Sequence, residues 1–108
     1  MNRTSRREKL EAMLTTTPDD QLLRYMLALE LEKAHEHVKS LDLLQSLMHD
    51  APPYVPAFLM AGQQLSGLGR NDDAAAAWRN GITEAQRQGN SHAAGEMSQF
   101  LAALQNPP

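Results

Sequence analysis

The sequence predicts an all-α fold of about six helices, arranged as antiparallel hairpins. Three observations lead to this prediction. Residues that favour helices, such as Ala, Leu, Met, Gln and Glu, are abundant, whereas aromatic residues make up 5% of the chain. Apolar residues recur at steps of three and four positions, which is the helical period. The sequence also resembles itself when it is shifted by 34 residues.

Composition limits the class of protein. The chain has 108 residues, of which 42% are hydrophobic and 21% charged, which is typical of one globular domain. A net charge of −3 disfavours a nucleic-acid partner, because phosphate binding needs clustered Lys and Arg. The chain contains no cysteine, so disulfide and thiolate chemistry are excluded. Since no apolar run suggests a leader or a membrane span, we expect no membrane partner and a cytoplasmic location.

The first predicted helix covers residues 5–17. Ser5 and Glu8 form a capping box at its start. Its inward face is expected to carry Leu10, Met13 and Leu14. A second helix is predicted to begin directly afterwards, with Thr17 as its N-cap and Pro18 in its first turn.

Two helical hairpins are predicted to follow the first helix, over residues 19–53 and 54–88. The first hairpin closes before Pro52, because a residue that precedes proline avoids the α region. Glycines end the helices of the second hairpin. A terminal capping helix then covers residues 90–106. We expect the chain, residues 1–108, to form a single domain.

The 34-residue shift aligns small residues with small ones and large residues with large ones. The aligned pairs include Leu10 and Leu44, Pro18 and Pro52, Ala28 and Gly62, Leu31 and Leu65, Ser40 and Ala74, and Leu44 and Trp78. Such an ordered set indicates one hairpin reused at a constant period, with small residues where helix axes approach closely. Gly62 and Ala74 are expected to form this close contact in the second hairpin, and Trp78 is expected to be buried.

The best-matched unit, about residues 55–88, resembles the tetratricopeptide repeat (TPR) family. The matching positions are Phe58, Ala61, Gly62, Leu65, Gly69, Ala74, Trp78 and Gly81. The preceding unit departs from the family at Leu47, where a small residue is usual, and at residues 35–37, where the turn normally has a glycine. The resemblance implies antiparallel hairpins stacked as a short right-handed superhelix.

Histidines are the obvious candidates for catalysis or metal binding. His35 and His37 have glutamates nearby, but they flank a predicted turn, whereas a transition-metal site needs three or more fixed ligands. The other two histidines have no evident Ser or Asp partner. We therefore expect no catalytic, cofactor-binding or metal-binding residues, and no enzyme activity.

The N-terminal helix carries a small basic cluster. Its members are Arg3, Arg6, Arg7 and Lys9. Glu8 and Glu11 are interspersed among them, which favours a solvated helix start over a nucleic-acid site.

The helix that follows Pro18 is apolar almost all round. Between Leu22 and Leu31 its strongly polar residues are Arg24 and Glu30, and one packing face cannot use so much apolar surface. In the resembled family, the first helix of each hairpin lines a concave groove. The groove residues implied here are Leu22, Tyr25, Met26, Leu29, Lys33, Val55, Leu59, Met60 and Gln63.

The resemblance implies a non-catalytic adaptor or scaffold that binds a peptide or helix of a protein partner of unknown identity. Methionine, tyrosine and leucine give a soft apolar surface suited to such a ligand. Two alternatives stay open. In the first, the same residues are ordinary core beneath another segment. In the second, they mediate self-association, as in a homodimer, and the oligomer is the functional form. Leu59, Met60 and Tyr25 occupy the sites where some TPR domains grip a terminal carboxylate, so that binding mode is not supported.

Overall fold

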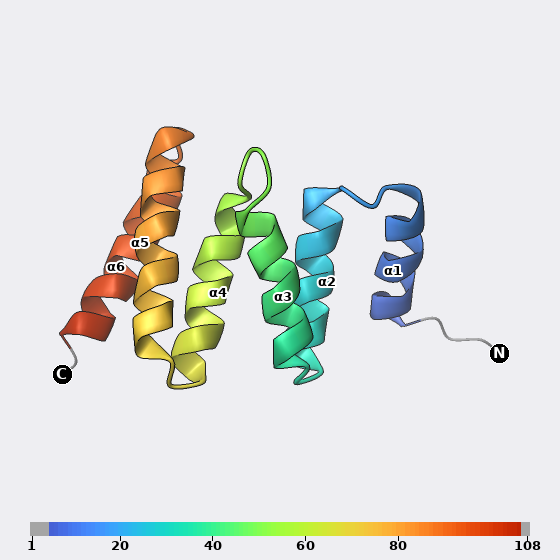
Figure 1. Cartoon of the computed structure of the whole chain (residues 1–108), viewed down its shortest axis with the longest axis horizontal. Coiled ribbons are helices and arrows are strands. Elements are labelled where there is room, and N and C mark those ends of the chain that lie inside the picture. Colours follow the sequence, from blue (N-terminus) through green and yellow to red (C-terminus); the bar gives the residue numbers. More distant parts are fainter. Residues whose placement is uncertain (1–4, 107–108) are drawn as a thin grey trace. The chain divides into compact units, whose positions relative to one another are not determined.

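A computed structural model describes residues 5–106, and every regular element in this range is an α-helix. The helices are α1 (Arg6–Thr16), α2 (Gln21–Lys33), α3 (His37–Met48), α4 (Val55–Gly67), α5 (Asn71–Arg87) and α6 (Ser91–Gln105), as Figure 1 shows. The predicted all-α fold is confirmed.

The chain divides into two compact units, which we call unit 1 (Met1–Leu47) and unit 2 (Met48–Pro108). Formation of a single domain stays a prediction.

The two helix starts in unit 1 differ in how well the sequence predicts them. At α1 the expected capping box is present: the Glu8 amide donates to the Ser5 side chain, and the Ser5 amide donates to the Glu8 carboxylate. At α2 the predicted cap is wrong. Asp20 is the N-cap and its carboxylate accepts from the Leu23 amide at 2.9 Å. A carboxylate also suits the positive end of the helix dipole, so α2 begins after Pro18.

Unit 1 packs α1 against α2 and α2 against α3. Leu10 of α1 is buried and Leu14 is half-buried, but Met13 is 52% exposed, so its predicted inward position is wrong. Residues four apart lie above one another on a helix, which places Leu10 and Leu14 on one face and turns Met13 away. Between α2 and α3, the Ser40 hydroxyl donates to the Ala28 carbonyl at 2.7 Å, and both residues are fully buried.

Three helices end in the same hydrogen-bonded turn. A residue with positive φ follows each of them: His35 (59°), Gly69 (78°) and Gly89 (75°). The next amide then bonds back to the helix, in the pairs Glu36 to Leu31 (2.9 Å), Arg70 to Leu65 (2.9 Å) and Asn90 to Ala85 (2.7 Å). These are Schellman motifs. His35 therefore occupies a left-handed position at which the next repeat has glycine.

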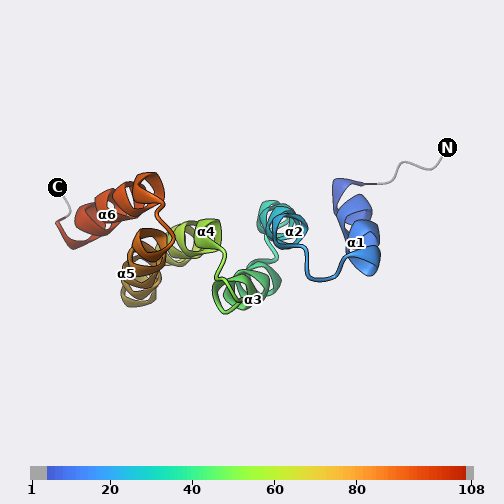
Figure 2. The same cartoon turned by 90° about the horizontal axis from the view of Figure 1, so that it is seen from above.

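Unit 2 is built around α5, which packs against both α4 and α6 (Figures 1 and 2). Its core consists of Val55, Phe58, Ala74, Trp78, Ala85, Ala94 and Met97. Trp78 is 3% exposed, which confirms its predicted burial. The indole Nε1 of Trp78 donates to the Leu59 carbonyl at 3.2 Å, and its ring stacks on Phe100 with centroids 5.5 Å apart.

Two glycines allow the helices of unit 2 to approach closely. A Cβ atom at Gly62 would overlap the indole of Trp78, which lies one turn beyond the expected Ala74 on α5. A Cβ atom at Gly81 would overlap Met97 of α6 and Phe58 of α4. Large side chains therefore fill the space that the glycines leave, as close packing of interiors requires.

Replacing His35 with glycine should raise the melting temperature. The left-handed conformation costs a residue with a Cβ atom about 1 kcal/mol, and the greater freedom of glycine in the unfolded chain offsets only part of this gain. His35→Ala is the control, because it removes the ring contact with His37 but keeps the Cβ atom. Circular dichroism melts of the two variants test this prediction. Equal melting temperatures would contradict the cost that we assign to the left-handed conformation at residue 35.

Replacing Gly62 with alanine should destabilise the protein by about 1 to 3 kcal/mol, because the methyl group must displace the Trp78 indole. Gly95 of α6 provides a matched control. Nothing lies within 4 Å of a Cβ atom at that position, so Gly95→Ala should instead stabilise by about 0.5 to 1 kcal/mol through helix propensity. Urea unfolding measures the change in unfolding free energy for each variant. Changes of the same sign in the two variants would contradict the prediction.

Candidate functional site

One side of α2 is used by α3. The Ala28 carbonyl accepts from Ser40, as described above, and the Arg24 guanidinium donates to the Ser46 hydroxyl at 2.7 Å. Leu31, which follows Ala28 by three positions, is buried on the same side. Part of the apolar surface of α2 is therefore ordinary core of unit 1.

A second side of α2 is used by α1. Glu30 forms an ion pair with Arg6 of α1, with Nε and Oε1 3.0 Å apart. Leu23 and Leu27 precede Glu30 by seven and three positions, so they lie on the same side of the helix. Both leucines are half-buried.

A third side of α2 differs in helical phase from the sides that meet α1 and α3. It carries Leu22, Met26, Leu29 and Lys33, with Tyr25 at its edge, and we call these five residues the α2 face. Their spacing of four, three and four positions makes a stripe along the whole helix. Leu22 is 56% exposed, Lys33 is exposed, and the other three are half-buried.

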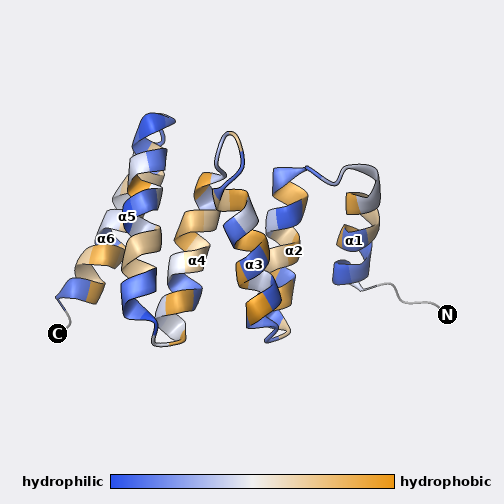
Figure 3. Ribbon diagram, in the orientation of Figure 1, coloured by the Kyte–Doolittle hydropathy of each residue, from blue (hydrophilic) through white to orange (hydrophobic). Residues whose placement is uncertain are grey.

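On α4, the predicted groove residues divide into two groups. Val55 is 4% exposed and belongs to the core of unit 2, so its predicted place in a groove is wrong. It precedes Gly62 by seven positions, which turns it to the side that meets Trp78. Leu59 packs against the same core. Met60 and Gln63, which we call the α4 face, are half-buried and are not part of that core cluster; the apolar character of α4 is visible in Figure 3.

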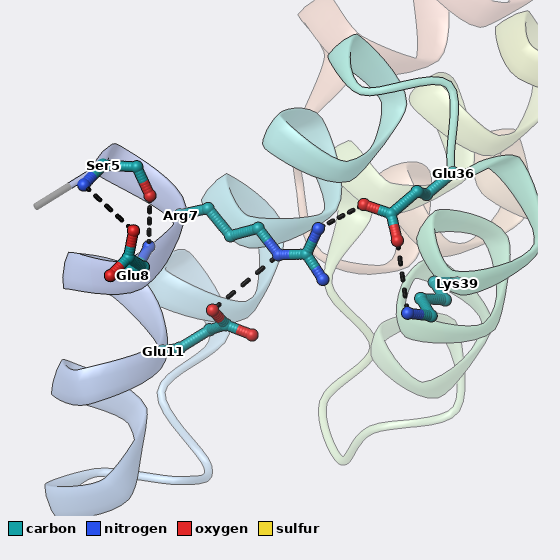
Figure 4. A network of polar contacts seen from close by, with 6 residues as sticks. All are labelled: Ser5, Arg7, Glu8, Glu11, Glu36 and Lys39. Atoms are coloured by element: carbon teal, nitrogen blue, oxygen red, sulfur yellow. Dashed lines mark hydrogen bonds and ion pairs between the residues drawn. The ribbon is translucent and has the colours of Figure 1, made fainter.

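Arg6 and Arg7 of α1 form ion pairs within unit 1, and Figure 4 shows those of Arg7. Arg7 pairs with Glu36 at the start of α3 and with Glu11 at 3.7 Å, and Glu36 also pairs with Lys39 at 3.2 Å. The hydrogen bond from Lys39 is the main cause that lowers the pKa of Glu36; burial opposes it, and the charge and hydrogen bond of Arg7 lower the pKa further. Arg6 and Arg7 of the predicted basic cluster thus form ion pairs with other helices of unit 1. Arg3 lies outside the described residues.

The histidines do not assemble a reactive site. His37 Nδ1 lies 2.7 Å from a Glu32 carboxylate oxygen, and His35 occupies the turn before it. Within residues 5–106, no group of three or more His, Asp and Glu side chains is placed to hold a metal ion. An open cavity between α5 and α6 has no ionisable side chain in its lining, which consists of Gln86, Gly89, Ser91, Ala94, Gly95 and Ser98.

Paired antiparallel helices with small residues at their contacts, repeated every 34 positions, define a helical-repeat protein. The sequence matches no model of a known protein family. It is 30% identical over 97 residues to the TPR repeat-containing protein PA0015 of Pseudomonas aeruginosa, across 90% of this chain and 92% of that protein. The solution structure of protein BPP2914 from Bordetella parapertussis is similar, with a TM-score of 0.79 and 30% identity, across 95% of this chain and 90% of that one. The chain belongs to the tetratricopeptide repeat family.

Acid should remove the contribution of Glu36 to stability. Because its pKa is lowered in the folded protein, the contribution is present above the unfolded pKa of about 4.3 and is lost as the pH falls through the lower folded value. Glu36→Gln should therefore melt at a lower temperature than the parent chain at neutral pH, and the difference should vanish in strong acid. A difference that persists unchanged in acid would show that the carboxylate charge is not its source.

Proposed function

We propose that this chain is a non-catalytic interaction module that binds an amphipathic helix or an extended apolar peptide of a protein partner. Membership of the TPR family indicates a protein-interaction module in general. The observation that supports the specific proposal is the α2 face, a largely apolar stripe at a different helical phase from the sides that meet α1 and α3. The α4 face is proposed as a second contact, carried by unit 2.

The chemistry of the α2 face suits a helical or extended apolar ligand. Leu22, Met26 and Leu29 are spaced as the anchor residues of an amphipathic helix are, so a partner side chain can pack between successive turns. The thioether of Met26 adapts to ligands of different shape. Tyr25 adds a large ring with a polar end, the type of residue that contributes most to binding energy at protein interfaces.

The same residues argue against catalysis at this surface. Apart from Tyr25 and Lys33, the side chains of the two faces do not ionise. Lys33 lies 3.5 Å from the Glu30 carboxylate at the end of α2, where a cation suits the helix dipole. General acid and base chemistry needs a pair of positioned ionisable groups, and α2 offers none along this stripe.

Replacing Met26 and Met60 together with glutamine should reduce the capture of protein partners from a lysate and leave the fold nearly intact. Both side chains are half-buried, so the new amides can still reach water, whereas a partner's apolar surface would have to desolvate them. Val38→Gln is the matched control, because Val38 lies on α3 and is already 74% exposed. Pull-down with mass spectrometry, circular dichroism and sedimentation velocity report on binding, folding and mass.

Three outcomes would contradict the proposal. Unfolding of the double variant would show that the two faces are ordinary core, because buried amides without partners are costly. Conversion of an oligomer into a monomer would show that the faces mediate self-association. Retention of every partner by a folded variant would place the binding surface elsewhere on the chain.

A further inference from the structure

Few buried apolar side chains hold α1 against the rest of unit 1. Leu10 is the one buried residue of this helix, whereas α5 buries Ala74, Ala75, Ala77, Trp78, Gly81 and Ala85. α1 has 11 residues, and helices shorter than about 12 to 15 residues are marginal by themselves in water. Its helical state therefore depends on its contacts with the rest of unit 1.

Ion pairs also join α1 to the other helices of unit 1. Arg6 and Arg7 lie on either side of Leu10 around the helix, and they pair with Glu30 of α2 and with Glu36 at the start of α3. These are long-range pairs, unlike the pair between Arg7 and Glu11 inside α1. The side chains of Arg7 and Glu36 are 34% and 30% exposed, so dissolved salt can screen their attraction.

The surface beneath α1 is apolar apart from Glu30, the partner of Arg6. Leu23 and Leu27 of α2 share the side of the helix that carries Glu30, and they flank Met26 of the α2 face. Separation of α1 would uncover these two leucines. The apolar surface of α2 would then extend from Met26 toward Leu23 and Leu27, with Glu30 exposed beside them.

We propose that α1 is a hinged helix that separates reversibly from the α2–α3 hairpin, and that its release uncovers a second apolar strip formed by Leu23 and Leu27. Residues 17–20 are the hinge, since α1 ends at Thr16 and α2 begins at Gln21. Local opening of a weakly held element below the global unfolding free energy is a general property of proteins. The release follows from contacts inside unit 1 alone; only its use, to admit a larger partner segment, rests on the proposed function.

Thiol labelling of the full chain tests the release, because the sequence has no cysteine and each variant carries a single one. Leu27→Cys places the thiol beneath α1, Leu31→Cys places it on the side of α3, and Leu22→Cys places it on the α2 face. The probe is iodoacetamide, which is uncharged and so insensitive to surface potential. Labelling is followed by mass spectrometry at about 0.01 M and about 1 M NaCl, between which the screening length falls about tenfold.

We expect labelling of Leu27→Cys to accelerate several-fold at high salt, while Leu22→Cys stays fast and Leu31→Cys stays slow. Adding Arg7→Gln should accelerate Leu27→Cys at low salt and reduce its response to salt. Adding Arg87→Gln, which removes only the pair with Glu84 inside α5, should have no effect. The measurement needs no partner, so its failure is independent of failure in the capture experiment.

Two results would overturn the proposal. One is a labelling rate of Leu27→Cys that responds neither to salt nor to Arg7→Gln. The other is acceleration of Leu31→Cys in step with Leu27→Cys, which would mean that the whole of unit 1 opens together. Hydrogen exchange of the parent chain checks the result if a cysteine variant fails to fold: α1 amides should exchange faster than α3 amides and respond to salt, and equal behaviour also overturns the proposal.

Discussion

The close approach of helices at small residues is the constraint on which the rest of the structure depends. In unit 2, Gly62 leaves room for the Trp78 indole, and Gly81 leaves room for Met97 and Phe58. In unit 1, the positions one repeat earlier than Gly62 and Ala74 are Ala28 and Ser40, which meet through a buried hydrogen bond. Equivalent positions of the two repeats therefore bring helices together once by side-chain packing and once by a polar contact.

This constraint also explains why an apolar surface remains on α2. A helix that packs closely on two neighbours uses only the sides that meet them, and α1 and α3 take two sides of α2. The remaining side of α2 carries Leu22, Met26 and Leu29, although leucine and methionine are residues that proteins usually bury. This side is the surface that we propose for partner binding.

Features that depend on the repeat period and on residue size were predictable from the sequence. Features that depend on which of several nearby groups makes a contact were not. The hairpins, the burial of Trp78 and the role of Gly62 follow from a 34-residue spacing and from volume alone. Thr17 and Asp20 can both cap a helix, and the sequence does not say which carboxylate or hydroxyl reaches a free amide. The resemblance implies a groove position for Val55, but its spacing of seven residues from Gly62 turns its side chain into the core of unit 2. The pairing of Arg6 and Arg7 with distant glutamates requires the folded arrangement.

The two units are stabilised by different kinds of interaction. Unit 2 has an apolar core around Trp78, and its Arg87–Glu84 and His92–Glu96 pairs each lie within a single helix. Unit 1 joins separate helices with the Arg6–Glu30, Arg7–Glu36 and Glu32–His37 pairs. Screening by salt and protonation act on such pairs and leave apolar contacts largely intact. Solution conditions should therefore alter the helices beside the proposed α2 face while unit 2 stays folded, so that any regulation of binding by ionic conditions would act through unit 1.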